Sequence, residues 1–81
     1  MKDHSTCRKA LKLDESGDWQ GAHNLVDHLN SEEAAWVHAY LHRKEGDQWN
    51  ADYWYQRAGK PGFRGSLDEE WQQLWDFFNE D

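Results

Sequence analysis

The fold is decided by a stretch that occurs twice, as Gly17-Asp18-Trp19-Gln20-Gly21-Ala22 and again as Gly46-Asp47-Gln48-Trp49-Asn50-Ala51. The two copies lie 29 residues apart (46 − 17), and the same offset relates Ala10 to Ala39. A fixed period in this range is typical of stacked helix–turn–helix units, which usually present a surface to a partner. The sequence therefore predicts an all-α protein built from antiparallel helix–turn–helix repeats.

Capping residues divide the chain into about five expected helices. Each Gly-Asp pair closes one helix with a left-handed glycine and opens the next with an aspartate N-cap. Ser66-Leu67-Asp68-Glu69 is a capping box before the last helix. The helices are expected at residues 5–16, 18–29, 32–45, 47–58 and 66–79. One domain, 1–81, would then consist of a repeat unit at 5–29, a second unit at 32–58, a loop at 59–65 and a capping helix at 66–79.

Composition narrows the function classes. The chain has 81 residues and a net charge of −7, which disfavours a nucleic-acid phosphate track or an anionic membrane surface. The one feature that favours nucleic-acid binding is a group of basic residues near the loop, Arg57, Lys60 and Arg64. The single cysteine, Cys7, excludes an internal disulfide and favours a reducing compartment. No apolar run follows Met1-Lys2-Asp3-His4, so we expect a cytoplasmic protein with no membrane partner. We also favour a monomer.

The last expected helix has one broad apolar stripe and a polar opposite side, as the end cap of a helical stack requires. The fourth expected helix has Trp49 and Tyr53 on the side opposite to its small residues. These two aromatic side chains therefore need another element to pack against them. The sequence therefore predicts that the last helix covers Trp49 and Tyr53. The stripe consists of Leu67, Trp71, Leu74, Trp75 and Phe78.

Two segments carry a family resemblance. The Gly17–Ala22 stretch resembles the Gly-Asp-aromatic turn of tetratricopeptide repeats. Residues 51–62 resemble the second helix of Sel1-like repeats, with their Ala-x-x-Trp-Tyr-x-x-Ala pattern. The resemblance covers residues 5–62, and its 29-residue period (46 − 17) is shorter than the roughly 34 residues of the tetratricopeptide form. It implies an α-solenoid that binds a peptide or protein on its concave side, which the first helix of each unit lines.

Trp36, Tyr40 and Arg43 are the candidate partner-binding residues, because they share one side of the third helix away from its alanines. Exposed Trp, Tyr and Arg together match the chemistry of interface hot spots. The alternative is that Trp36 and Tyr40 are core residues packed on a neighbouring helix. The expected function is a small non-enzymatic module that binds a protein or peptide, with no catalytic residues and no cofactor. In the first helix, the positions that correspond to Trp36, Tyr40 and Arg43 are occupied by Cys7, Leu11 and Asp14.

The histidines offer a second class of function. His38 and His42 stand at i, i+4, a spacing that allows two imidazoles to hold one metal ion. His23 and Asp27 form a similar pair on the preceding helix. The preferred interpretation is structural, with the histidines hydrogen-bonded between helices and no metal assigned. The alternative is a metal- or small-ligand-binding protein using His38, His42 and His23, with hydrolytic activity as a further option.

The acidic side chains are interpreted as helix caps or solvated groups rather than as general bases. Asp18 and Asp47 are expected to be N-caps, and Glu32 and Glu33 to be first-turn acids. The run Asp68-Glu69-Glu70 is interpreted in the same way.

Overall fold

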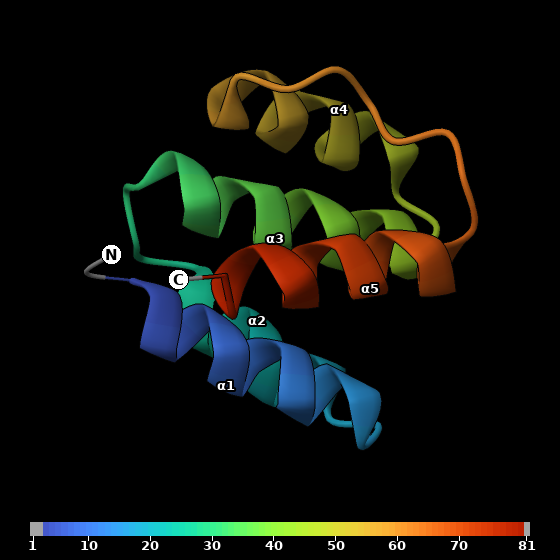
Figure 1. The fold of residues 1–81 in the computed structure, drawn as a ribbon. Helices are drawn as coiled ribbons and strands as arrows, with labels where there is room; N and C mark the ends of the chain where they lie inside the picture. Colours follow the sequence, from blue (N-terminus) through green and yellow to red (C-terminus); the bar gives the residue numbers. More distant parts are fainter. Residues whose placement is uncertain (1–2, 81) are drawn as a thin grey trace.

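The computed structural model describes residues 3–80, in which the chain forms five α-helices and no strand. The all-α class and the number of helices are therefore as predicted. Met1, Lys2 and Asp81, which the expected domain includes, lie outside the described residues. The helices are α1 (His4–Glu15), α2 (Trp19–Val26), α3 (Glu32–Lys44), α4 (Gln48–Ala58) and α5 (Leu67–Phe78), as Figure 1 shows.

Side-chain caps set four of the helix starts. The carboxylate of Asp18 accepts a hydrogen bond from Gly21 N at 2.9 Å, and that of Asp47 accepts one from Asn50 N at 3.2 Å. Ser31 caps α3, and Ser66 with Glu69 forms the complete capping box of α5. Each cap satisfies an amide that has no partner within its helix. The caps deduced from the sequence are therefore confirmed.

The second helix is shorter than expected, because it ends at Val26 rather than at residue 29. After it, Leu29 N donates to Val26 O at 3.1 Å, which closes a turn. The chain must reverse between α2 and the Ser31 cap of α3 within a few residues, so the last expected turn of helix becomes this connection.

The helices form two antiparallel hairpins, α1–α2 and α3–α4, with α2 lying alongside α3 (Figure 1). Four alanines, one in each helix of the two hairpins, are fully buried. A larger side chain at such a packed position is expected to force its neighbours to shift. The alanines are Ala10, Ala22, Ala39 and Ala51.

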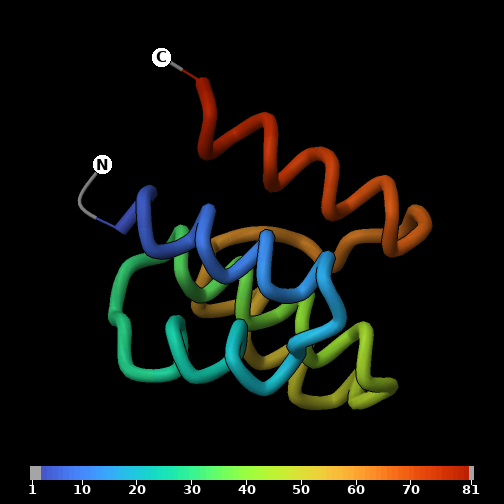
Figure 2. The backbone as a smooth tube through the Cα atoms, turned by 90° about the horizontal axis from the view of Figure 1, so that it is seen from below, coloured from blue at the N-terminus to red at the C-terminus, as the bar shows by residue number. Residues whose placement is uncertain are grey.

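The position of α5 differs from the prediction. It lies across α1 and α3, on the side of the molecule opposite to α2 (Figures 1 and 2). Trp49 and Tyr53 on α4 stay uncovered, with 82% and 48% of their surfaces exposed. The expectation that α5 covers them was wrong, because residues 59–66 carry the chain over to the α1–α3 groove. There Leu74 and Phe78 are buried, and both helices offer hydrogen-bond partners as well as apolar surface.

Two hydrogen bonds fix α5 against α1. The indole Nε1 of Trp71 donates to Leu11 O at 3.1 Å, and Arg8 Nη1 donates to Phe78 O at 2.6 Å. Cys7 and Leu11 of α1 are fully buried beneath α5. None of the helices in the described range is both long enough and apolar enough to cross a membrane.

Candidate functional site

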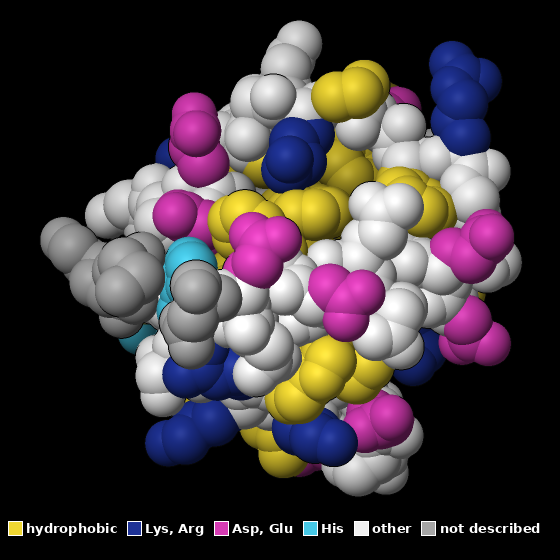
Figure 3. Space-filling model, in the orientation of Figure 1, with side chains coloured by type: hydrophobic (Ala, Val, Ile, Leu, Met, Phe, Trp, Pro, Cys, Tyr) yellow, Lys and Arg dark blue, Asp and Glu magenta, His cyan; other side chains and the backbone are white. Residues whose placement is uncertain are grey.

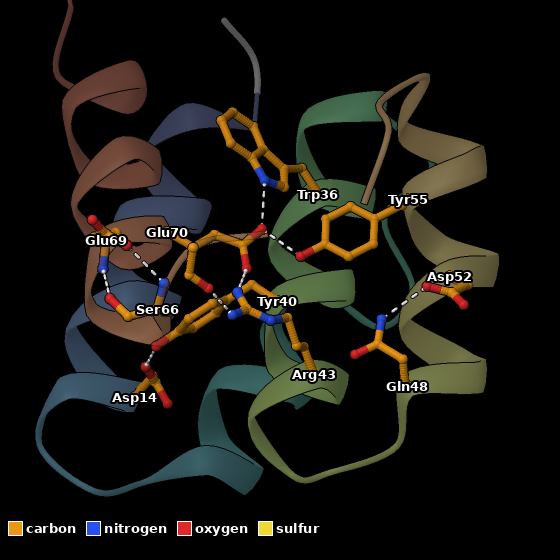
Figure 4. A network of polar contacts seen from close by, with 11 residues as sticks. Asp14, Trp36, Tyr40, Arg43, Gln48, Asp52, Tyr55, Ser66, Glu69 and Glu70 are labelled. Carbon is orange, nitrogen blue, oxygen red and sulfur yellow. Dashed lines mark hydrogen bonds and ion pairs between the residues drawn. The ribbon is translucent and has the colours of Figure 1, made fainter. Parts of the chain in front are cut away.

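The carboxylate of Glu70 on α5 is fully buried and is surrounded by donors from α3 and α4. Trp36 Nε1 donates to Oε2 at 3.1 Å, and the Tyr55 hydroxyl donates to the same oxygen. Arg43 Nη1 donates to Oε1 at 2.7 Å. Figure 4 shows these three side chains converging on Glu70. The negative charge is thus paired and hydrogen-bonded, as a buried carboxylate requires.

A second buried carboxylate lies nearby on α1. Asp14 is 2% exposed, and its two oxygens accept from the Tyr40 hydroxyl at 2.8 Å and from Lys44 Nζ at 2.9 Å. Tyr40 and Lys44 both belong to α3. The two acids therefore join α3 to α1 and to α5.

The stripe of Trp36, Tyr40 and Arg43, which the sequence analysis placed on an open surface, lies beneath α5. Trp36 is 7% exposed and Tyr40 is 2% exposed. Arg43 donates to Glu70 and also to Gly65 O in the loop before α5. The groove holds a helix with acidic and apolar side chains, but that helix is part of the same chain. The core alternative therefore describes the location of Trp36 and Tyr40.

Both tyrosines of these clusters stay protonated at neutral pH. Burial raises the pKa of Tyr40, and the hydrogen bond to Asp14 raises it further. Burial and the hydrogen bond to Glu70 have the same effect on the pKa of Tyr55. The two hydroxyls are thus permanent donors to the carboxylates.

Glu70 is fully buried, although its place in the run Asp68-Glu69-Glu70 had indicated a solvated first-turn acid. The helical spacing contains the signal that identifies it. Glu70 stands four residues before Leu74 and three after Leu67, so it lies on the edge of the apolar stripe of α5. Asp68 and Glu69 lie off that stripe and are exposed.

On the opposite side of α3, three histidines converge. His38 and His42 come from α3, one turn apart, and His23 comes from α2. The Nε2 atoms of His23 and His38 are 3.0 Å apart, and one ligand atom from each of the three rings lies within 4.8 Å of the others. The rings of His38 and His42 are stacked at 4.9 Å, whereas His23 meets both edge-on.

Aromatic side chains hold these rings in place. Trp54 of α4 stacks on His38 with ring centroids 3.9 Å apart, and Trp19 of α2 stacks on His23 at 4.9 Å. Trp19 is itself fixed, because its Nε1 donates to Leu41 O at 2.8 Å. The pKa of His38 is lowered to about 4, first by burial and then by His23 and His42. Its ring is therefore neutral at physiological pH.

The structural interpretation of the histidines is supported in part, since His23 and His38 hydrogen-bond between helices. It leaves two atoms without partners, however. The Nδ1 atoms of His23 and His38 are buried and have no hydrogen-bond partner among residues 3–80. Buried polar atoms without a hydrogen-bond partner are rare in folded proteins, so the two Nδ1 atoms are unusual features of this structure.

The outer face of α4 is the third distinctive feature. Trp49 and Tyr53 lie one helical turn apart and are the large hydrophobic side chains exposed within residues 3–80. Arg57, a further turn along, donates to the Tyr53 hydroxyl at 3.2 Å and lies 5.8 Å from the Tyr53 ring. Figure 3 shows the face on which α5 lies, where acidic and basic side chains are spread among apolar patches.

A scan against protein-family models, a search of curated proteins and a search of solved structures found no match for this chain. The resemblance to tetratricopeptide and Sel1-like repeats therefore stays a prediction.

Proposed function

We propose that this protein is a non-enzymatic interaction module that binds an amphipathic helix of a partner protein on the outer face of α4. The observation that carries this proposal is the exposure of Trp49, at 82%, beside the half-exposed Tyr53. Folded proteins seldom leave a tryptophan this open, and Trp, Tyr and Arg are the residues that dominate binding energy at interfaces.

The arrangement of the hairpins suggests that the occupant is a helix. In the first hairpin α2 packs its far side against α3. The repeat makes α4 the counterpart of α2. Whereas α2 packs against two helices, α1 and α3, the backbone of α4 packs against α3 alone among the described helices. A helical array with an unfinished end buries that end by adding another helix. A partner helix on α4 would occupy the place of the next unit.

The side chains around this face define the chemistry of the partner. An apolar residue of the partner would pack on the Trp49 and Tyr53 rings. Arg57 is exposed, and within residues 3–80 its one side-chain hydrogen bond is the contact of Nη1 with the Tyr53 hydroxyl. Its guanidinium could therefore bind a carboxylate of the partner in a bidentate manner. The expected partner helix therefore has an apolar stripe with an acidic residue beside it.

The test compares Trp49→Ala with Gln73→Ala, an exposed control on α5. Because the Trp49 side chain is largely in solvent, its removal should change the free energy of unfolding by no more than about 0.5 kcal/mol. Proteins retained from an extract of the native cell would be identified for wild type and both variants, and their dissociation constants measured. Trp49→Ala should weaken the partner by about 2 kcal/mol or more, roughly 30-fold, whereas Gln73→Ala should bind normally.

Two results would contradict the proposal. One is a partner that Trp49→Ala binds as tightly as wild type does. The other is a wild-type dimer in sedimentation experiments that Trp49→Ala converts to a monomer, because the occupant of the α4 face would then be a second copy of this chain.

A further inference from the structure

We propose that His23, His38 and His42 form a binding site for one divalent transition-metal ion of the zinc class, with one coordination position left to water. The ligands of this site come from α2 and α3, whereas the face proposed for a partner consists of Trp49, Tyr53 and Arg57 of α4. Three features support this site: the geometry of the three imidazoles, the two ring nitrogens that face each other across α2 and α3, and a carboxylate behind the third ring.

The nitrogen separations suit a single ion. Two imidazole nitrogens bound to a tetrahedral zinc ion at about 2.0–2.1 Å lie roughly 3.3 Å apart. The Nε2 atoms of His23 and His38 are 3.0 Å apart, so a few tenths of an ångström of ring movement would admit the ion. His42 completes the set, since its ligand atom lies within 4.8 Å of the other two. His42 is partly exposed, so its ring has solvent on one side into which it can turn when it binds the ion.

The present hydrogen bonds do not satisfy the His23–His38 pair. Two neutral imidazoles facing each other through Nε2 can share only one proton between them. The acceptor ring then carries an N–H on Nδ1, and the donor ring carries a lone pair there. Both Nδ1 atoms are buried without a partner in the described part of the chain. An ion bound by the two Nε2 atoms would take the place of the single shared proton, and each ring would then carry its N–H on Nδ1. His38 is 2% exposed, so the contact that the ion would replace is largely shielded from water.

His42 has the outer contact that metal-bound histidines usually have. Its Nδ1 lies 2.6 Å from Glu45 Oε1, which fixes the proton on Nδ1 and leaves the Nε2 lone pair free. A carboxylate behind a ligating imidazole orients the ring and strengthens it as a ligand. The spacing His42-x-x-Glu45 on the end of α3 provides this support from a single turn of helix.

The donor set selects the class of metal. Three neutral imidazoles without a carboxylate ligand suit zinc, cobalt, nickel or copper, whereas magnesium and calcium require oxygen ligands. Three protein ligands also leave a fourth tetrahedral position for water. The indoles of Trp19 and Trp54 stack on two of the rings and restrict their movement.

The test titrates the full chain with Zn²⁺ alone, and separately with Co²⁺ to report geometry through its visible absorption. We expect one ion per chain. The ring nitrogen signals of His23, His38 and His42 should shift in NMR spectra, and those of His4 and His28 should not. At a Zn²⁺ concentration about a hundredfold above Kd, the Tm should rise by roughly 10 °C or more, and a chelator should reverse the rise.

His42→Gln is the decisive variant, because His42 is partly exposed and its loss leaves the contact between His23 and His38 in place. Its Zn²⁺ affinity should fall by about a hundredfold or more, and that of Glu45→Gln by about 10–100-fold. His28→Gln, an exposed histidine outside the cluster, should bind as wild type does.

The proposal is overturned if wild type shows no one-to-one binding, or if His42→Gln binds Zn²⁺ as tightly as wild type. Shifts confined to His4 and His28 would also overturn it. The NMR titration of wild type gives this answer even if a variant fails to fold.

Discussion

Replacing Glu70 by alanine should unfold the domain or bring it close to unfolding. The buried carboxylate accepts from Trp36, Tyr55 and Arg43, so the change leaves three donors without an acceptor. Removing one partner of a buried ion pair costs about 3–5 kcal/mol, because the remaining charge is then uncompensated. A domain of 81 residues has a total stability of only about 4–12 kcal/mol. The substitution therefore removes a large part of that stability.

The measurement is urea unfolding followed by tryptophan fluorescence and far-ultraviolet circular dichroism. Glu70→Gln keeps an oxygen acceptor and the shape of the side chain but removes the charge that Arg43 faces. Its cost should be smaller, about 1.5–3 kcal/mol, the value of hydrogen bonds to charged groups. For a protein of this size each kilocalorie corresponds to about 4–8 °C in Tm.

Glu69→Ala is the matched control, because Glu69 is the adjacent acid on the same helix but is exposed. It removes only half of the capping box, the bond from Ser66 N to Glu69 Oε1 at 2.7 Å, which is worth about 1 kcal/mol. If Glu70→Ala costs no more than Glu69→Ala, the buried network does not hold α5 in place and the reasoning fails.

Three further predictions concern packing and pH. Ala22→Leu and Ala51→Leu should each lower the free energy of unfolding by about 1–3 kcal/mol through overpacking, and a neutral result in urea would contradict the close helix approach at that site. Deleting residues 66–81 should abolish cooperative thermal unfolding, because it uncovers the α1–α3 groove; a sharp transition in the truncated monomer would refute this. Burial, followed by the charges of Asp3 and Glu33, raises the pKa of Cys7 from 9.0 to about 12. Between pH 9 and 12 the unfolded chain therefore loses a proton that the folded chain keeps. Stability should fall with rising pH by up to about 1.4 kcal/mol per unit from this group, and a Cys7→Ala variant with the same slope would exclude it.

The helices were predictable because their signals are local. Asp18, Ser31, Asp47 and Ser66 each cap the helix that follows through a contact three residues away, and such contacts can be deduced from spacing alone. The burial of Ala22 and Ala51 followed from the repeat for the same reason. The end of α2 was less predictable, since it depends on how the chain turns into α3.

The histidine cluster and the Glu70 network could not be predicted from local spacing, because each depends on contacts between residues far apart along the chain. The i, i+4 spacing of His38 and His42 is visible in the sequence, but the approach of His23 to 3.0 Å depends on how α2 packs against α3. Trp36 and Arg43 were correctly placed on one side of α3, yet no local pattern says which element covers that side. Their partner, Glu70, is 34 and 27 residues away along the chain.

Apolar area alone does not explain where α5 lies. Its stripe could in principle cover either the α1–α3 groove or the outer face of α4, where Trp49 and Tyr53 are exposed. The two surfaces differ in their polar groups. Beneath α5, the donors of Trp36, Arg43 and Tyr55 meet Glu70, whereas on the outer face of α4 the cation beside Trp49 and Tyr53 is Arg57, which is exposed. A buried ion pair adds little net stability over apolar packing, but an unpaired buried charge is strongly penalised. We infer that Glu70 favours the groove, because three donors from α3 and α4 satisfy its buried carboxylate there.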